Sequence, residues 1–424
     1  MDVHVPGDKS ITHRALILAA LATGRSRVRR PLVGADTRST AGVLRALGAG
    51  VGELGEETVI EGAGLHGLRA ADGVLDCGNS GTTARLLMGV LAGFPFADTL
   101  TGDASLRSRP MRRVTEPLSR MGATFEELGE PDRLPIRMRG GALRPLSHVS
   151  PQASAQVKSA LLLAGLTGGV EVTVREPLPS RDHTERMLSR LGVALRREQH
   201  ADGGASVTLS PSPQLPAFDI EVPGDASSAA FLIAHALLAA PGPVRVRGVG
   251  LNPTRAGFLD VVRRMGGRIA LENVRESCGE PIGDIIAERS ALRGTIIGPA
   301  EIPSLVDEVP VLAVLAARAE GTTVVEGAAE LRVKESDRIH ALVSNLSRIG
   351  ASVEERPDGL VVHGSSQPLA GTIRTEGDHR IAMAFGVLGA AAGTHIEIDE
   401  RDVVDVSFPG FWEVLGQVAE NSAP

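Results

Sequence analysis

The sequence predicts an α/β protein of two domains, built from a structural unit that recurs six times. Two observations predict this: an Ala/Leu-rich apolar helix recurs about every 70 residues, and each copy runs into a β-rich stretch. A third is the pair of related segments VPGDKS, at 5–10, and VPGDASS, at 222–228. Because the second segment falls midway along the chain, we expect the six units to divide three plus three.

Each predicted unit contains one buried helix and one amphipathic helix. The apolar helix ends near a glycine, as at Gly24, and a strand-like stretch such as VEVTVREPL follows. After a polar loop, the amphipathic helix closes on Leu-Gly, Met-Gly or Ile-Gly, as in RMGATF; the sixth copy, VLGQVA, is degenerate. We expect the apolar helices inside and the amphipathic ones over the sheets. The apolar helices are predicted to begin near Ser10, Gly81, Ser154, Ser227, Asp307 and His379.

The two VPGD segments are predicted to be the crossings between the domains. This places units 1 to 3 in a domain of residues 9–223, and units 4 to 6 in a domain of residues 1–8 plus 224–424. Three units bury their own core, so we expect a monomer.

Composition favours a small ligand over a macromolecular partner. The formal net charge of -7 argues against nucleic acid and anionic membranes, and aromatic residues for base stacking make up only 2% of the chain. The two cysteines, Cys77 and Cys278, have no paired spacing that would indicate a disulfide framework or a zinc site. Because no signal-like or membrane-length apolar stretch is seen, we expect a cytoplasmic location.

Anion binding is expected at the N-termini of the apolar helices. Six helix N-termini facing one interdomain cleft would contribute about 2–6 kcal/mol to the binding free energy of an anion, whereas micromolar affinity requires about 8 kcal/mol. Cationic side chains should therefore supplement them, although any single arginine here could equally be a surface residue. Candidates at helix starts and polar loops are Lys9, Arg14, Arg107, Arg109, Arg181, Lys334, Arg338 and Arg380.

Lysine is rare in this sequence. It occurs only at Lys9, Lys158 and Lys334, and every other Lys-or-Arg position is arginine. These three sites are candidates for needing a compact ammonium; the alternative is that they are solvated lysines kept by chance.

Acidic residues sit in the same places as these cations: Asp307 and Glu308 open the fifth apolar helix, and Glu335 lies beside Lys334. A carboxylate among cations stays ionised, so Asp307 or Glu335 could act as a base, with a plain N-cap as the alternative for Asp307. For Asp8 and Asp225 we expect capping. The cluster Ser154, Ala155 and Gln156 could be a cap or a ligand clamp.

Metal and nucleotide chemistry lack their usual signatures. His13, His183 and His379 precede or open helices, but no pair has the spacing of a metal site. The chain also lacks a Gly-x-x-x-x-Gly-Lys-Ser/Thr loop, and no Gly-x-Gly-x-x-Gly is convincing. We therefore expect no metal and no cofactor.

At these residues the sequence resembles the 5-enolpyruvylshikimate-3-phosphate synthase family of enolpyruvyl transferases. The resemblance runs from end to end, in the family's order, through PGDKSITHRA, GNSGTTARLL, GDASLRSRPM, ASAQVKSALLLAGL, SRDHTERML, VPGDASSAAF, DEVPVLAVLA, ELRVKESDRI, DHRIAMAF and SFPGF. It implies a two-domain inside-out α/β barrel of six βαβαββ units, three per domain, with two hinge crossings. It also implies two substrates, phosphoenolpyruvate and shikimate 3-phosphate, and addition followed by elimination of phosphate.

The resemblance also implies roles for individual residues. Asp307 would take the proton of the attacking hydroxyl, Glu335 would exchange a proton with the methylene carbon, and Lys9 and Lys334 would lie close to the reacting groups. The residues implied for shikimate 3-phosphate or for general substrate contact are Lys9, Ser10, Arg14, Ser154 and Gln156. Those implied around phosphoenolpyruvate are Gly81, Arg109, Arg338 and Arg380. Further substrate-binding residues expected on the same motifs are Asn79, Ala155, Arg181, Lys334, Asp378 and His379.

The chain departs from the family pattern at two places. Val406 stands where some members carry a lysine before the Ser-Phe-Pro element, and Leu86 follows Arg85 where others have proline. Because Gly81 is retained, we expect inhibition by glyphosate in competition with phosphoenolpyruvate.

Three alternatives stay open. The sister transferase acting on UDP-N-acetylglucosamine usually holds a reactive cysteine in a mobile loop, and the loop 102–111 has none. An RNA 3'-terminal phosphate cyclase is disfavoured by the acidic charge and the lack of tyrosine. A non-catalytic phosphate-binding protein is disfavoured because Lys9, Asp307, Lys334 and Glu335 are intact.

Overall fold

The chain folds into two compact units in the computed structural model, which describes residues 1–239, 242–277, 279–391 and 393–420. The N-terminal unit is Gly7–Val222, and the C-terminal unit combines Met1–Pro6 with Pro223–Pro424. The sequence had placed the divisions after residues 8 and 223. They fall slightly earlier because Gly7 already packs on the N-terminal unit: a Cβ there would lie 2.2 Å from the Arg30 carbonyl oxygen. Cys278 lies outside the described residues.

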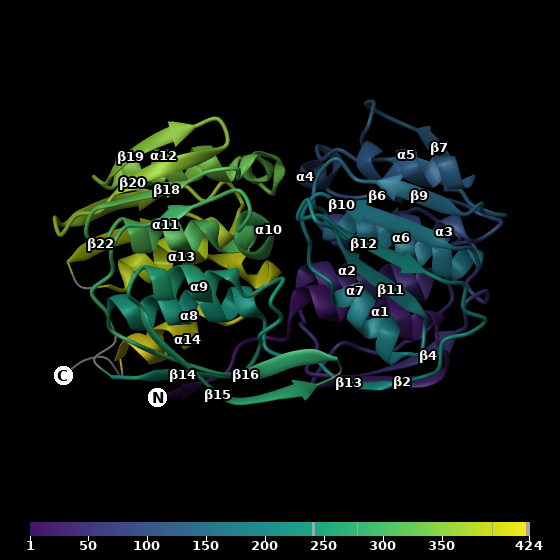
Figure 1. Cartoon of the computed structure of the whole chain (residues 1–424), viewed down its shortest axis with the longest axis horizontal. Helices are drawn as coiled ribbons and strands as arrows, with labels where there is room; N and C mark the ends of the chain where they lie inside the picture. Colours follow the sequence, from purple (N-terminus) through teal and green to yellow (C-terminus); the bar gives the residue numbers. More distant parts are fainter. Residues whose placement is uncertain (240–241, 278, 392, 421–424) are drawn as a thin grey trace. The chain divides into compact units, whose positions relative to one another are not determined.

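The N-terminal unit contains three four-stranded sheets (Figure 1). Its helices are α1 (Lys9–Leu21), α2 (Ala35–Ala46), α3 (Gly81–Ala92), α4 (Ala104–Arg107), α5 (Arg112–Met121), α6 (Ala155–Gly168) and α7 (His183–Arg190). In sheet order, its strands are β13 (Asp219–Glu221), β2 (Thr23–Arg29), β4 (Glu57–Ala63), β3 (Gly50–Val51); β5 (Leu75–Asp76), β6 (Ala97–Thr101), β8 (Ile136–Arg139), β7 (Thr124–Glu127); and β9 (Leu146–Val149), β10 (Val172–Glu176), β12 (Ala205–Leu209), β11 (Leu195–Gln199).

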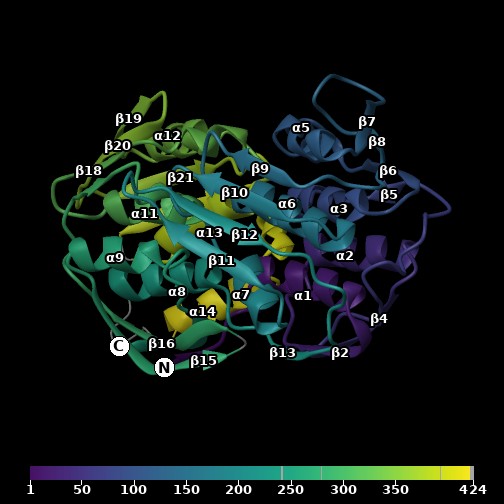
Figure 2. The ribbon, with the colours of Figure 1, turned by 45° about the vertical axis from the view of Figure 1, so that its right-hand side comes forward.

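The C-terminal unit contains two four-stranded sheets and one two-stranded sheet (Figure 2). Its helices, 3-10 helices included, are α8 (Ala226–Leu238), α9 (Gly257–Arg264), α10 (Ile302–Leu305), η1 (Val306–Glu308), α11 (Val309–Ala316), η2 (Ala329–Val333), α12 (Arg338–Arg348), α13 (His379–Gly389), η3 (Arg401–Val406) and α14 (Phe411–Glu420). In sheet order, its strands are β1 (Asp2–Val3), β14 (Val244–Gly250), β16 (Glu280–Glu288), β15 (Arg268–Ser277); β17 (Ile296–Ile297), β18 (Thr322–Val325), β20 (Gly359–His363), β19 (Ser352–Arg356); and β21 (Leu369–Ile373), β22 (Thr394–Ile398).

All five four-stranded sheets share one topology. An edge strand pairs in parallel with its neighbour, and two antiparallel pairings follow, as in β5-β6-β8-β7. A parallel pair needs a crossover, and the apolar helices α3, α6 and α11 supply it inside their own sheets. For α1 and α8 the parallel partner is distant in sequence: β13, which precedes the second crossing, pairs with β2, and β1, which precedes the first crossing, pairs with β14. The strand before each crossing thus completes a sheet of its own unit.

The sixth unit is smaller than the sequence predicted. Among the described residues its sheet consists of β21 and β22, paired in parallel around α13, and α14 continues through Leu415 and Gly416 instead of ending there. The prediction of six full βαβαββ units is therefore wrong for this unit, which is the one with the degenerate repeat. A mixed α/β fold in two units is observed, whereas closure into an inside-out barrel stays a prediction.

Helix burial follows the sequence pattern. In α1 every residue from Ile11 to Leu21 is buried, and α8 and α13 are buried almost as completely. By contrast, α5 buries only Val114, Pro117, Leu118 and Met121, one stripe at helical spacing. Each fully buried leucine contributes about 1.5–3 kcal/mol, so the apolar helices form the centre of each core.

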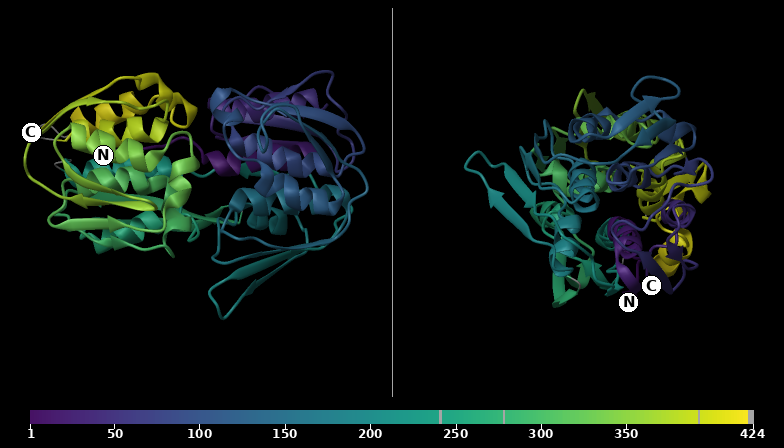
Figure 3. Two further views of the ribbon diagram at one scale, coloured as in Figure 1. Left: turned by 90° about the horizontal axis from the view of Figure 1, so that it is seen from above. Right: turned by 90° about the vertical axis from the view of Figure 1, so that its right-hand side faces the viewer.

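Close packing fixes the buried helices against one another. A Cβ on Gly89 of α3 would lie 2.1 Å from the carbonyl oxygen of Ala160 in α6, so only glycine permits this approach. At the outside of the N-terminal unit, the hairpin of β11 and β12 extends away from the helices (teal in Figure 3). Its exposed residues include Arg196 and Arg197.

Candidate active site

Small polar side chains cap the buried helices, as the sequence predicted. The Asp8 carboxylate accepts from the Ile11 amide at 2.8 Å, and Asp225 accepts from the amides of Ser227 and Ser228. Each such cap contributes about 1 kcal/mol and holds the first turn in place. The capping interpretation of Asp8 and Asp225 is confirmed. Ser80, Ser154 and Asp378 cap α3, α6 and α13 in the same way.

In the N-terminal unit, the starts of α1, α3 and α6 are joined by hydrogen bonds. Arg14 of α1 donates from Nε to Thr184 Oγ1 at 2.7 Å, and from a terminal nitrogen to Ser159 Oγ of α6 at 2.8 Å. Arg85 of α3 donates to Gln156 Oε1 at 2.7 Å, and Gln156 donates back to Thr82 at 3.0 Å. These bonds bring together the helix starts that the sequence assigned to anion binding.

Lys9 lies at the start of α1, and Arg109 lies close to the start of α3. The Lys9 ammonium pairs with Asp36 at 2.9 Å, at the start of α2. Arg109 donates to Asn79 Oδ1 at 2.6 Å, and Asn79 donates to Asp103 at 2.7 Å. Asn79 thus orients the Arg109 guanidinium next to the start of α3, where Gly81 leaves room for it.

Ser154 is held by a buried ion pair. The Ser154 amide donates to Glu176 at 2.7 Å, and Glu176 pairs with Lys158 at 2.9 Å. Arg181 lies in the loop between β10 and α7. Among the three lysines, Lys158 is thus buried and paired within the core, where its ammonium has a structural partner.

In the C-terminal unit, Arg338 is the centre of the candidate site. Its side chain is 1% exposed and donates from Nε to Asp378 at 2.7 Å, from Nη2 to Glu335 at 2.6 Å and from Nη1 to Asp307 at 3.4 Å. Burial alone would lower the pKa of this guanidinium, but the nearby carboxylates Asp378, Glu335 and Asp307 raise it above its ordinary value. Arg338 therefore keeps its positive charge while buried.

The two proposed proton-transfer residues both contact Arg338, as just described. Asp307 lies in η1, just before α11, and Arg380 donates to its carbonyl oxygen at 3.3 Å. The N-cap residue of α11 is Glu308, so the alternative that Asp307 is a plain N-cap of this helix is wrong. Lys334 pairs with Glu330 at 3.2 Å. Asp378, with both oxygens bonded to Arg338, is fully buried and holds that guanidinium in place.

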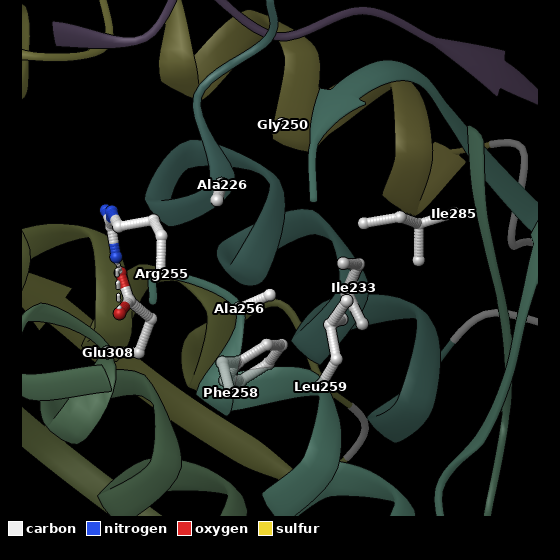
Figure 4. Close-up of a pocket in the computed structure, with 9 residues that line it drawn as sticks. All are labelled: Ala226, Ile233, Gly250, Arg255, Ala256, Phe258, Leu259, Ile285 and Glu308. Atoms are coloured by element: carbon white, nitrogen blue, oxygen red, sulfur yellow. Dashed lines mark hydrogen bonds and ion pairs between the residues drawn. The ribbon is translucent and has the colours of Figure 1, made fainter. Parts of the chain in front are cut away.

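A second buried ion pair supports this segment. Arg255 donates to both oxygens of Glu308, at 2.8 and 2.7 Å, and Ser227 of α8 bonds to the same carboxylate. Figure 4 shows this pair at the edge of a pocket whose other walls are mostly apolar. Nine described residues line the pocket, and none belongs to the predicted substrate-binding set.

The buried histidines hold no metal cluster. In the part of the chain that the structure describes, no group of three His, Cys, Asp or Glu side chains is placed to bind a metal ion. His13 is fully buried against Thr40 at 2.7 Å; burial, with Lys9 and Arg14 nearby, holds the pKa of its imidazole well below the ordinary value. His379 is buried at the start of α13.

Cys77 is not a reactive thiol. Its side chain is buried, and burial, with Asp76 beside it, raises the pKa of the thiol to about 12. In the sequence, Cys77 lies outside the loop 102–111, where the sister transferases usually hold their reactive cysteine.

Four residues of the site were missed in the sequence. Asp36, Arg85 and Arg255 hold Lys9, Gln156 and Glu308, and Glu176 holds Ser154. Asp36 follows GA at the start of an amphipathic helix, a position where a carboxylate could have been suspected. The others have no local signal, because their partners lie far away along the chain.

Comparison with known proteins decides the family. A family model described as EPSP synthase (3-phosphoshikimate 1-carboxyvinyltransferase) matches residues 1–415. The chain belongs to the EPSP synthase family. This confirms the resemblance seen in the motifs and makes the chain an enolpyruvyl transferase of the shikimate pathway.

Individual relatives agree along the whole length. The 3-phosphoshikimate 1-carboxyvinyltransferase of Desulforudis audaxviator is 50% identical over 98% of this chain and 96% of its own. That of Bacillus subtilis is 44% identical over 99% and 97%. A solved EPSP synthase from Acinetobacter baumannii superposes with a TM-score of 0.85 at 40% identity, covering 99% of this chain and 95% of its own.

A more distant solved structure shares the fold alone. The enolpyruvyl transferase NikO from Streptomyces tendae has a TM-score of 0.78 at 18% identity, over 99% of this chain and 94% of its own. None of the helices in the described residues has the length and apolarity that a membrane span requires.

Proposed function

We propose that this enzyme transfers the enolpyruvyl group of phosphoenolpyruvate to the 5-hydroxyl of shikimate 3-phosphate and releases phosphate. The observation that carries the proposal is the contact of Arg338 with both Asp307 and Glu335, since it places two carboxylates around one buried cation. Arg380 on the Asp307 carbonyl adds a second guanidinium at the same place. Such a cluster suits a substrate that carries phosphate and carboxylate groups.

The proposed reaction is an addition followed by an elimination. Glu335, protonated, gives a proton to the methylene carbon of phosphoenolpyruvate, while Asp307 takes the proton of the 5-hydroxyl, whose oxygen bonds to C2. From the tetrahedral intermediate, the C2–O bond to phosphate breaks, the proton held by Asp307 passes to the departing phosphate, and the methyl group returns a proton to Glu335. Steps of general acid and base catalysis of this kind are each worth about 10²–10⁴ in rate.

The remaining residues are proposed to bind and orient. Phosphoenolpyruvate is placed with Gly81, Arg109, Arg338 and Arg380. Shikimate 3-phosphate is placed with Ser10, Arg14, Ser154, Gln156 and Arg181. Asn79, Ala155, Asp378 and His379 support these contacts, and Lys9 and Lys334 serve the reacting groups. The protein is proposed to act as a monomer without a cofactor.

Phosphate release tests the proposal. The protein is mixed with phosphoenolpyruvate and, in parallel, with shikimate 3-phosphate or UDP-N-acetylglucosamine as the acceptor. Release only with shikimate 3-phosphate is expected. Release only with the sugar nucleotide would transfer the assignment to the sister enzyme, and binding of both anions without release would favour a non-catalytic protein.

A further inference from the structure

A single buried carboxylate joins two segments of the N-terminal unit. Glu176, at the end of β10, has 2% of its surface exposed. Its Oε1 accepts from the Ser154 amide at 2.7 Å, and both of its oxygens accept from Ser180 Oγ at 2.8 Å. The Ser180 amide lies 3.4 Å from Oε2. One side chain therefore fixes the N-cap of α6 and the residue just before Arg181.

Lys158 balances this carboxylate. Its ammonium lies 2.9 Å from Glu176 and 2.9 Å from Glu185, and it donates to the Ser180 carbonyl at 3.2 Å. Burial alone would lower the pKa of this ammonium, but Glu185 and Glu176 outweigh burial and raise the pKa. The cluster therefore keeps its charges, and Ser180 is held at both its amide side and its carbonyl side.

An apolar side chain could not do the same work, and a neutral amide would place an NH2 group opposite the Lys158 ammonium in place of one carboxylate oxygen. The Ser154 amide, the Ser180 hydroxyl and Lys158 all direct hydrogens at one point, and each would lose a partner if Glu176 were apolar. Because both ions are almost fully buried, their geometry is strongly constrained.

The geometry points to Glu176 as a positioning residue for shikimate 3-phosphate, which sets the position of Ser154 relative to the Ser180–Arg181 segment. This inference rests on the proposed function, in which Ser154 and Arg181 contact that substrate. The residues proposed around phosphoenolpyruvate take their partners elsewhere: Arg109 bonds to Asn79, and Arg338 bonds to Asp378. A substitution at Glu176 should therefore weaken the binding of shikimate 3-phosphate and leave the binding of phosphoenolpyruvate unchanged.

The test compares Glu176→Gln with Glu185→Gln. Both variants remove one of the two carboxylates that face Lys158, so their thermal stability should fall by similar amounts. Of the two, only Glu176 bonds to Ser154 and Ser180. We expect Glu176→Gln to raise KM for shikimate 3-phosphate about 10- to 100-fold, with KM for phosphoenolpyruvate and kcat within about threefold of wild type. Glu185→Gln should leave both KM values unchanged.

Direct binding separates failure of this inference from failure of the proposed function. Calorimetric titration with shikimate 3-phosphate should show tight binding by the wild type and weakened binding by Glu176→Gln. No binding by the wild type would refute the proposed function itself. Binding by the wild type with equal affinity in Glu176→Gln, or an equal loss in Glu185→Gln, would overturn the positioning role.

A second variant covers the case in which Glu176→Gln does not fold. Glu176→Asp keeps the charge opposite Lys158 but retracts it by one methylene, so it cannot reach Ser154 and Ser180 together. We expect a smaller rise in KM for shikimate 3-phosphate, about 3- to 10-fold, in a folded protein. An unchanged KM in this variant would also overturn the proposal.

Discussion

Arg338 and Asp378 form a pair in which neither side chain is open to solvent: Nε lies 2.7 Å from Oδ2, and the exposed fractions are 1% and 0%. Removing Asp378 takes away the one carboxylate of the three around Arg338 that is fully buried; the remaining two, Glu335 and Asp307, are 21% and 14% exposed. Breaking a buried ion pair is strongly destabilising. We expect Asp378→Asn to lower the free energy of unfolding by about 3 kcal/mol or more, and to raise KM for phosphoenolpyruvate because Arg338 loses its orientation. Urea unfolding followed by the fluorescence of Trp412, the single tryptophan, measures the first effect.

Asp337→Asn is the matched control for that experiment. Asp337 caps the same helix, α12, and its pair with Arg332 is partly exposed, with 38% of the Asp337 side chain accessible. Asparagine caps equally well, so this variant should lose less than about 1 kcal/mol. Equal losses in the two variants would contradict the assignment of Arg338–Asp378 as the dominant pair.

Asp307→Asn should separate binding from turnover. The change removes the proposed base while Glu335 and Asp378 still balance Arg338, so the fold and the anion sites should survive. We expect kcat to fall about 10²- to 10⁴-fold with substrate affinity nearly unchanged, measured by steady-state kinetics and calorimetry. Asp405→Asn, at an exposed carboxylate, should behave as wild type. Loss of binding together with turnover would favour a binding role for Asp307.

His235 should make stability depend on pH. It is fully buried in α8, neither ring nitrogen has a hydrogen-bond partner among the described residues, and burial lowers its pKa from 6.5 to about 4. The fold therefore favours the neutral ring. The contribution of neutral His235 to the free energy of unfolding is complete above pH 6.5 and is lost as the pH falls from 6.5 towards 4. The loss amounts to about 3 kcal/mol at the acid end of this range.

The variant His235→Leu should remove that dependence. We expect the difference in unfolding free energy between variant and wild type to grow as the pH falls from 7 to 5, and the exposed His395→Leu to show no such trend. Parallel pH profiles for wild type and His235→Leu would contradict the assignment. At neutral pH the variant should also be more stable by about 1 kcal/mol, because two unpaired polar atoms are removed.

Gly81 should control inhibition by glyphosate. We expect glyphosate to inhibit the wild type in competition with phosphoenolpyruvate. A Cβ at position 81 would lie 2.9 Å from Arg85 Nη1 and 3.5 Å from Arg109 Nη1, crowding the space in front of these guanidinium groups. Gly81→Ala should raise the inhibition constant about 10-fold or more with a smaller rise in KM for phosphoenolpyruvate. Initial rates at several inhibitor concentrations measure both.

Gly42→Ala is the control, because a Cβ there meets nothing within 4 Å. It should leave the inhibition constant unchanged. Undiminished turnover of the wild type at saturating glyphosate would refute the expectation for this site.

The buried helices were predictable because one local pattern specifies them. An apolar run opened by a small polar residue gives both the burial and the cap, and α3 and α13 begin at the predicted Gly81 and His379. The sixth sheet was not predictable in the same way. Strand pairing depends on partners that are distant in sequence, and the degenerate VLGQVA was the only sign that this unit would be reduced.

In the candidate site, too, residues on local motifs were predictable, whereas contacts between segments distant in sequence were not. Residues on motifs at helix starts, such as Lys9 and Arg338, lie where the sequence placed them. Lys158 could not be told from the other two lysines, because its partners Glu176 and Glu185 meet it only after β10 and α7 pack on α6. All three lysines pair with carboxylates, but only Lys158 is almost fully buried, with 6% of its side chain exposed against 17% for Lys9 and 22% for Lys334.

The measurement that tests the central claim most directly is isotope incorporation during the reaction in heavy water. Addition and elimination make the methylene carbon a transient methyl group, so deuterium should appear at this carbon in the product and in recovered phosphoenolpyruvate, and only when both substrates are present. Glu335→Gln should abolish the incorporation together with turnover. Product that forms with phosphate release but carries no deuterium at this carbon would contradict enolpyruvyl transfer by addition and elimination.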